Sequence, residues 1–114
     1  MEVYFDSAAT GKVLPEAVET MVKAMTEVYG NPSSASILGI EAGNVLKKSQ
    51  EDIARLINAE PSEIYFTSGG TEGDNWAIFG TAYGYKRSGK HIITTNTEHP
   101  AINLPLEALK EEGF

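Results

Sequence analysis

A chain of 114 residues is close to the usual size of one domain and is long enough to bury a single modest core. Its composition, 41% hydrophobic and 22% charged, is that of an ordinary globular protein and not of a disordered or fibrous one. A formal net charge of -7 repels nucleic-acid phosphates and anionic lipid, so neither nucleic acid nor a membrane is expected as a partner.

The residue counts also limit the chemistry. The chain has no cysteine, which excludes disulfides and thiolate metal sites, and its two histidines, His91 and His99, are too few for a zinc cage. The N-terminus shows no basic region followed by an apolar stretch, and no apolar run approaches the roughly 18 residues of a membrane span. We therefore expect no metal site and a cytoplasmic location.

The first half of the chain predicts a loop and two helices. Small and polar residues from 7 to 12 are typical of a turn. Apolar residues at three- and four-residue spacing, with a proline in the first turn, predict a helix from Pro15 to about Tyr29. Residues 30–34, Gly-Asn-Pro-Ser-Ser, end it, and a second apolar stripe predicts a helix from about Leu38 to Asn58.

The second half alternates between strand and helix. The segment 64–67 is β-prone, a glycine pair follows, and a helix is predicted from Thr71 to about Tyr83. The β-branched run 92–95 predicts a buried strand, and apolar spacing predicts a helix from Ala101 to about Glu112. This alternation favours an α/β layer with a largely parallel sheet. Because two strands leave their edges uncovered, the chain is predicted to be the opening of a larger α/β domain.

The strongest local signal is the glycine turn that precedes the helix at Thr71. Glycines let the backbone approach a ligand, and a helix N-terminus presents free N–H groups with a partial positive charge. Gly70 and Thr71 are therefore candidate anion-binding residues, with Thr71 as the helix cap and Asp74 completing a capping box. The alternative is a tight turn with a cap and no ligand. The segment is neither a Walker A loop nor a dinucleotide fingerprint.

His99 follows the predicted strand 92–95, and the carboxyl ends of parallel strands are where α/β proteins bind ligands. Its imidazole can stack on a planar ring or move a proton. The alternative is that His99 caps the next helix or lies on the surface. His91 is predicted to be structural, and Glu72 and Glu98 to be solvated or capping groups.

Four motifs extend over nearly the whole chain, from Tyr4 to the helix after His99. The motifs are Tyr4-Phe5-Asp6-Ser7-Ala8-Ala9-Thr10, Gly30-Asn31-Pro32-Ser33-Ser34, Phe66-Thr67-Ser68-Gly69-Gly70-Thr71-Glu72-Gly73-Asp74-Asn75 and Thr97-Glu98-His99. In this order and spacing, they resemble the start of cysteine desulfurases in the class V aminotransferase family.

The resemblance implies the N-terminal part of a fold-type I pyridoxal-phosphate-dependent transferase, an α/β fold with a mainly parallel sheet flanked by helices, incomplete as it stands. Residues 1–14 would form an N-terminal arm, 15–60 a helical segment, and 61–114 the start of the large cofactor-binding α/β domain. From the residues alone, a right-handed βαβ crossover would make the strands 64–67 and 92–95 close parallel neighbours. The family geometry implies instead that they do not pair with each other. Apolar helix faces around Val22 and Leu46 would then lie exposed.

The implied activity is removal of sulfur from L-cysteine, which gives alanine and an enzyme persulfide. Carried over by position, Gly70 and Thr71 would bind the phosphate of pyridoxal 5'-phosphate, and His99 would stack on its ring and act in catalysis. The implied partners are a small amino-acid substrate, the remaining C-terminal part of the enzyme, and a second copy in a homodimer of the full-length form. Ser36 and Gly11 differ from most relatives, which leaves the substrate preference open.

The covalent groups of this chemistry are missing from the sequence. No lysine has the context of the lysine that holds the cofactor, and no cysteine can carry a persulfide. The isolated chain is therefore expected to be inactive. The alternatives are another class V enzyme, such as a selenocysteine lyase or an aminotransferase, and a truncated protein that binds phosphate or a partner without catalysis.

Overall fold

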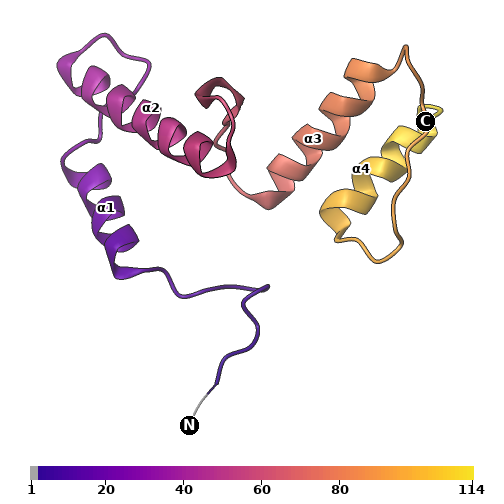
Figure 1. Cartoon of the computed structure of the whole chain (residues 1–114), viewed down its shortest axis with the longest axis horizontal. Helices are drawn as coiled ribbons and strands as arrows, with labels where there is room; N and C mark the ends of the chain where they lie inside the picture. Colours follow the sequence, from indigo (N-terminus) through magenta and orange to yellow (C-terminus); the bar gives the residue numbers. More distant parts are fainter. Residues whose placement is uncertain (1–2) are drawn as a thin grey trace. The chain divides into compact units, whose positions relative to one another are not determined.

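The computed structural model describes residues 3–114, which form helices joined by loops and turns (Figure 1). The chain divides into two compact units, Met1–Ile64 and Tyr65–Phe114. No helix within residues 3–114 is long and apolar enough to cross a membrane. The elements are α1 (Pro15–Thr26), α2 (Ile37–Ile57), the 3-10 helix η1 (Pro61–Glu63), α3 (Gly70–Tyr85) and α4 (Pro100–Glu111).

Helix α1 confirms the first predicted helix but ends earlier than the apolar spacing suggested. Pro15 opens it without a side-chain cap, because a proline has no N–H that would need an acceptor. At its end, Glu27 and Val28 both donate their N–H groups to the carbonyl of Lys23, which closes the last turn at Thr26. None of its residues is buried, and Val22 is exposed as expected.

Helix α2 confirms the second predicted helix, and both of its ends have a physical cause. The Ser36 hydroxyl accepts the N–H of Gly39 at 3.2 Å, a standard N-terminal cap. Asn58 ends the helix in the left-handed conformation, with φ of 56°, which asparagine tolerates well. The turn η1 follows and is tied back to α2, because Gln50 donates its amide to the carbonyl of Ile64 at 3.0 Å.

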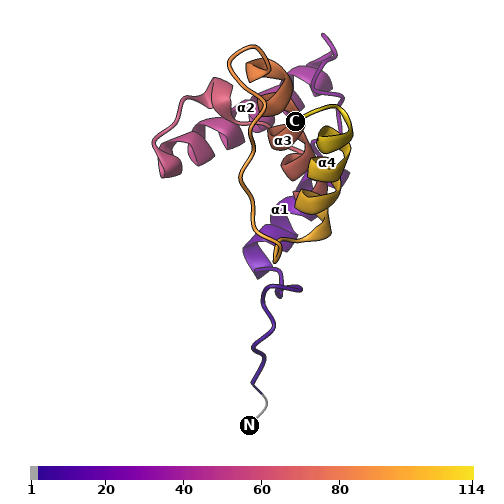
Figure 2. The ribbon, with the colours of Figure 1, turned by 90° about the vertical axis from the view of Figure 1, so that its right-hand side faces the viewer.

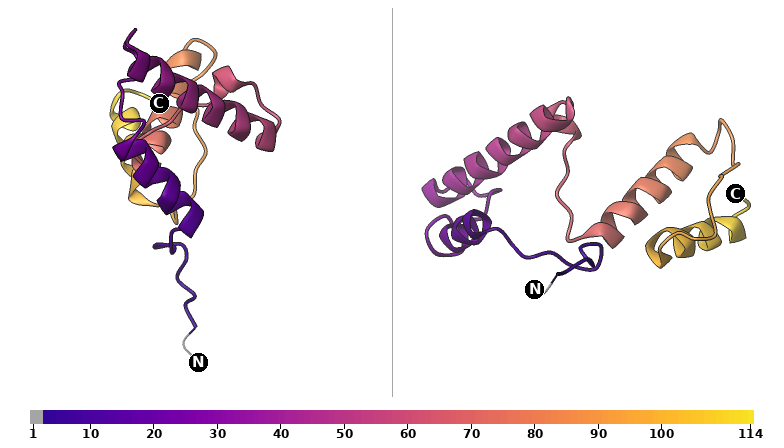
Figure 3. Two further views of the ribbon diagram at one scale, coloured as in Figure 1. Left: turned by 90° about the vertical axis from the view of Figure 1, so that its left-hand side faces the viewer. Right: turned by 60° about the horizontal axis from the view of Figure 1, so that its bottom comes forward.

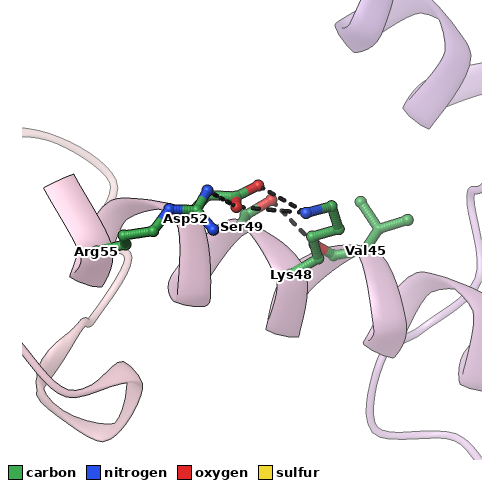
Figure 4. Close-up of polar contacts among 5 residues, drawn as sticks. All are labelled: Val45, Lys48, Ser49, Asp52 and Arg55. Atoms are coloured by element: carbon green, nitrogen blue, oxygen red, sulfur yellow. Dashed lines mark hydrogen bonds and ion pairs between the residues drawn. The ribbon is translucent and has the colours of Figure 1, made fainter.

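The polar face of α2 carries a small charge network (Figure 4). Asp52 accepts from Lys48 at 3.1 Å and from Arg55 at 2.6 Å, and Ser49 donates its hydroxyl to the carbonyl of Val45 at 2.9 Å. The hydrogen bond from Lys48, with the charges of Lys48 and Arg55, holds the pKa of the Asp52 carboxyl below its ordinary value. All three charged side chains are solvated, so the network stabilises α2 only slightly.

The second unit is built on helices α3 and α4, which pack side by side and begin at the same end (Figures 1 and 2; Figure 3, right). Leu109 of α4 is fully buried, and Ala82 and Ala101 lie in the same small core. Near the C-terminal ends of both helices, Tyr83 donates its hydroxyl to Glu112 at 2.9 Å. Lys90 adds a hydrogen bond to the Glu112 carbonyl, at 3.1 Å.

Neither of the two predicted strands is formed in residues 3–114, so the predicted parallel sheet is not confirmed. Residues 64–67 and 92–95 are outside any regular element, and no strand occurs in the part of the chain that the structure describes, residues 3–114. A strand exists only through hydrogen bonds to a neighbour, and these segments have none. The carbonyl of Ile64 is taken by a glutamine side chain instead. Because neither segment forms a strand, the expectation that the two strands do not pair with each other stays a prediction.

Candidate functional site

The N-terminus of α3 is an open turn of backbone N–H groups. The helix begins at Gly70, and Gly69 occupies the cap position with an extended backbone and no side-chain cap. The first N–H groups of a helix have no acceptor within that helix. A Cβ added to Gly69 or Gly70 would meet no atom within 4 Å, so the turn is accessible. The structure therefore places Gly70 and Thr71 in the first turn of a helix, as predicted.

The predicted cap was wrong in its details. Thr71 lies inside the first turn and not at the cap position, so it forms no capping box with Asp74. Glu72 closes the turn instead, because its carboxylate accepts both the N–H and the hydroxyl of Ser68, each at 2.6 Å. These bonds, the hydroxyl first, hold the pKa of the Glu72 carboxyl below its ordinary value. Glu72 thus ties the residue before the cap position to the first turn of α3, while its side chain stays exposed.

His99 is the cap residue of α4. Its Nδ1 accepts the N–H of Ala101 at 3.1 Å, and Pro100 provides the first helical residue. The turn before it is held by two further bonds: Thr95 donates its hydroxyl to the Glu98 carboxylate at 2.8 Å, and the Asn103 amide donates to the Glu98 carbonyl at 2.9 Å. The capping alternative for His99 is therefore confirmed. Its ring is exposed, so capping leaves it accessible to a ligand.

Asn75 connects the two predicted parts of the site. Its amide donates to the carbonyl of Thr71 at 2.8 Å and to the carbonyl of Ala101 at 3.3 Å. Helices α3 and α4 begin at the same end of the unit (Figure 1). Gly70 in the first turn of α3 and His99 at the cap of α4 therefore belong to that end. Sequence reasoning included Asn75 in a motif without giving it a role. Its spacing of four residues from Thr71 was the available signal.

The lysines and the two pockets of this unit lie away from Gly70, Thr71 and His99. Lys86 caps the C-terminus of α3, Lys110 is in the last turn of α4, and Lys90 contacts the end of α4. These pockets, of about 680 and 360 Å³, are lined by residues such as Ile92, Leu106 and Phe114, and by none of the predicted site residues. No group of three possible metal ligands occurs among residues 3–114. The site is therefore an open pair of helix N-termini, with an accessible glycine turn at one and an exposed histidine at the other, and it has no lysine of its own.

A family model and two similar curated proteins point to the same family. The family model described as aminotransferase class-V matches residues 3–114. The protein named cysteine desulfurase IscS of Neisseria meningitidis is 50% identical over 98% of this chain and 28% of its own length. That of Clostridium botulinum is 45% identical over 99% and 28%.

A solved structure titled NifS-like protein matches with a TM-score of 0.91 and 40% identity. The match covers all of this chain and 31% of the solved one. The chain thus spans less than a third of the length of these relatives. The chain is therefore similar in fold to one part of that structure, although no strand occurs in residues 3–114.

Proposed function

This chain belongs to the aminotransferase class-V family, and from this premise we propose that it is one part of a pyridoxal-phosphate-dependent cysteine desulfurase. The enzyme would take sulfur from L-cysteine and leave alanine, with the sulfur held as a persulfide on an enzyme cysteine. The observation that carries this proposal is 45–50% identity to proteins named cysteine desulfurase along 98–99% of the chain. An amino-acid substrate, a homodimer of the full-length form and a cytoplasmic location belong to the same proposal.

The residues at the start of α3 and α4 suit pyridoxal phosphate. Gly70 and Thr71 would hold its phosphate, since their turn is open and a helix N-terminus attracts an anion. His99 would contact the ring and hold or move a proton, because its imidazole is exposed at the same end of the unit. When bound, the cofactor supplies an electron sink for breaking bonds at the substrate.

The chain needs the rest of such an enzyme for the covalent steps. It has no cysteine for the persulfide, and the three lysines of its second unit lie at the opposite ends of α3 and α4 from Gly70 and His99. The remaining two thirds of an enzyme of the relatives' length would supply both groups. We therefore expect the 114-residue chain to release no sulfide from cysteine.

A chimera tests the proposal directly. Residues 1–114 would replace the matching segment of the Neisseria meningitidis relative, and alanine and sulfide formed from L-cysteine would be measured. We expect desulfurase activity. A folded chimera that releases no alanine would count against the proposal and favour a protein that binds phosphate without catalysis.

Two substitutions separate the capping role of His99 from its chemical role. Asparagine is a preferred N-cap, so His99→Asn keeps α4 capped, whereas His99→Ala costs about 1 kcal/mol of stability. We expect both variants to lose activity by about 100-fold or more, since neither side chain can transfer a proton. Full activity in the stable His99→Asn chimera would show that the histidine is only a cap.

A further inference from the structure

We propose that Asn75 is a positioning residue that fixes His99 relative to the first turn of α3. Its effect on catalysis rests on the function proposed above, but its effect on the histidine does not. Asn75 makes no hydrogen bond to His99 or to Gly70. It acts through the backbone of the two residues that it contacts, Thr71 and Ala101.

Ala101 is the point through which the effect passes. Its carbonyl accepts the amide of Asn75, and its N–H is donated to Nδ1 of His99. Ala101 is also buried, with 7% of its surface exposed, and Asn75 is half-buried beside it. Partial exclusion of water makes both bonds more costly to lose than bonds on the open surface. The backbone at Ala101 is thus held on one side by α3 and on the other by the histidine.

The cap also fixes the protonation pattern of the neutral histidine. Because Nδ1 accepts an N–H, it cannot carry a proton, so a neutral imidazole carries its proton at Nε2. The proton that His99 can donate therefore lies on the nitrogen away from the helix. If Ala101 is released from α3, the cap weakens, and we expect His99 to populate both tautomers and more than one orientation.

Other bonds in the unit do not replace Asn75. Tyr83 and Glu112 join α3 and α4 at their far ends, at 2.9 Å. Asn103 donates to the carbonyl of Glu98 and so organises the turn before His99, but it does not reach α3. Among residues 65–114, Asn75 is the side chain that donates from α3 to the first turn of α4.

The test uses the chimera with two Asn75 variants and one matched control. Asn75→Ala removes both bonds. Asn75→Ser removes only the bond to Ala101, because a serine hydroxyl reaches the carbonyl four residues earlier, as Ser49 does for Val45, but is too short to reach α4. The control, Tyr83→Phe, also removes one hydrogen bond between α3 and α4, at the far end.

Two readouts are needed, because a general loss of stability would change activity alone. The first is the tautomer of His99 from ¹⁵N shifts, with the His99 signal identified by its loss in His99→Asn. The second is kcat and KM for L-cysteine. In both Asn75 variants we expect the Nε2–H signature to become mixed. We also expect kcat to fall by about 10- to 100-fold with KM changed less than about twofold, because a misplaced group slows the chemical step. Tyr83→Phe should leave both readouts unchanged.

The two proposals fail in different ways. A His99 signal that stays Nε2–H in Asn75→Ser and Asn75→Ala, as in Tyr83→Phe, overturns the positioning role whatever the activity. An Nδ1–H signature in the unsubstituted chimera overturns it as well. An inactive chimera in which the His99 signal still responds to Asn75 overturns the proposed function and supports the positioning role.

Discussion

Glu72 lies in the first turn of α3 and accepts both hydrogen bonds that Ser68 can donate, from its hydroxyl and from its N–H. These bonds hold the pKa of the Glu72 carboxyl below its ordinary value. A carboxyl whose pKa is depressed by folding stabilises the folded turn at pH values above its unfolded pKa. That contribution is lost as the pH falls through the lower, folded pKa. The turn at Gly70 is thus expected to loosen only in acid.

The first prediction is that Ser68→Ala raises the pKa of Glu72 toward the ordinary glutamate value. The substitution removes the larger cause, the hydroxyl, and leaves the backbone bond. The side-chain carboxyl ¹³C shift of Glu72, followed between about pH 2 and 7, gives the pKa. Ser62→Ala, in the turn η1, is the matched control and should leave Glu72 unchanged. An unaltered pKa in Ser68→Ala would mean that the hydroxyl bond is not formed in solution.

At Gly39, in the first turn of α2, helix propensity and local packing favour different residues. Alanine is the better helix former by about 1 kcal/mol, so propensity alone favours Gly39→Ala in α2. A Cβ at this position would, however, meet the carbonyl of Asn31 at 2.7 Å, and would also press on Ser34. The loop that precedes α2 therefore folds over a site where only glycine fits.

The second prediction is that Gly39→Ala lowers the helicity of the first turns of α2, with an overpacking cost of about 1 to 3 kcal/mol. Cα chemical shifts from residue 37 onward measure it. Gly80→Ala in α3 is the matched control: nothing lies within 4 Å of its added Cβ, so helicity there should rise. Higher helicity in both variants would show that the loop does not hold its close contact with Gly39.

At the scale of elements, sequence patterns located the helices because helix signals are local. Pro15 starts α1, and the predicted second, third and fourth helices begin within a residue of the observed starts. The strands failed for the complementary reason, since strand pairing depends on residues distant in the chain. Thr71 was a reasonable cap by residue type, but the helix begins at Gly70, which places the cap at Gly69.

In the candidate site, too, local features could be predicted and contacts between helices could not. The places of Gly70, Thr71 and His99 at helix starts could be predicted, because glycine turns and residues before a helix are visible in the sequence. Asn75 could not, because its role requires α4 to lie against α3, and that packing is not encoded in any short motif. The roles of Gly70, Thr71 and His99 toward a cofactor stay predictions until a ligand is tested.

At the scale of the whole molecule, the buried core is very small for a chain of 114 residues. Leu109 is the one large side chain that is fully buried among residues 3–114. Of the other five buried apolar residues, four are alanines and the fifth, Ile64, lies at the end of η1. Large apolar side chains such as Met25, Ile37 and Ile93 are exposed. Ordering a backbone costs about 1 to 2 kcal/mol per residue, which so little buried area cannot offset.

The third prediction is that the 114-residue chain alone unfolds without a sharp cooperative transition, and that it binds an apolar dye or self-associates. The apolar side chains of α1 are exposed, and the backbone of the segment 92–95 is unpaired. In an enzyme of the relatives' length, the remaining two thirds of the chain would cover these surfaces. The same residues, placed in the chimera, should unfold cooperatively and bind little dye. Calorimetry, dye fluorescence and sedimentation compare the two forms. A monomeric chain that melts in one cooperative step, with dye binding as low as that of the chimera, would contradict this. It would show that these 114 residues form a stable core without the rest of an enzyme.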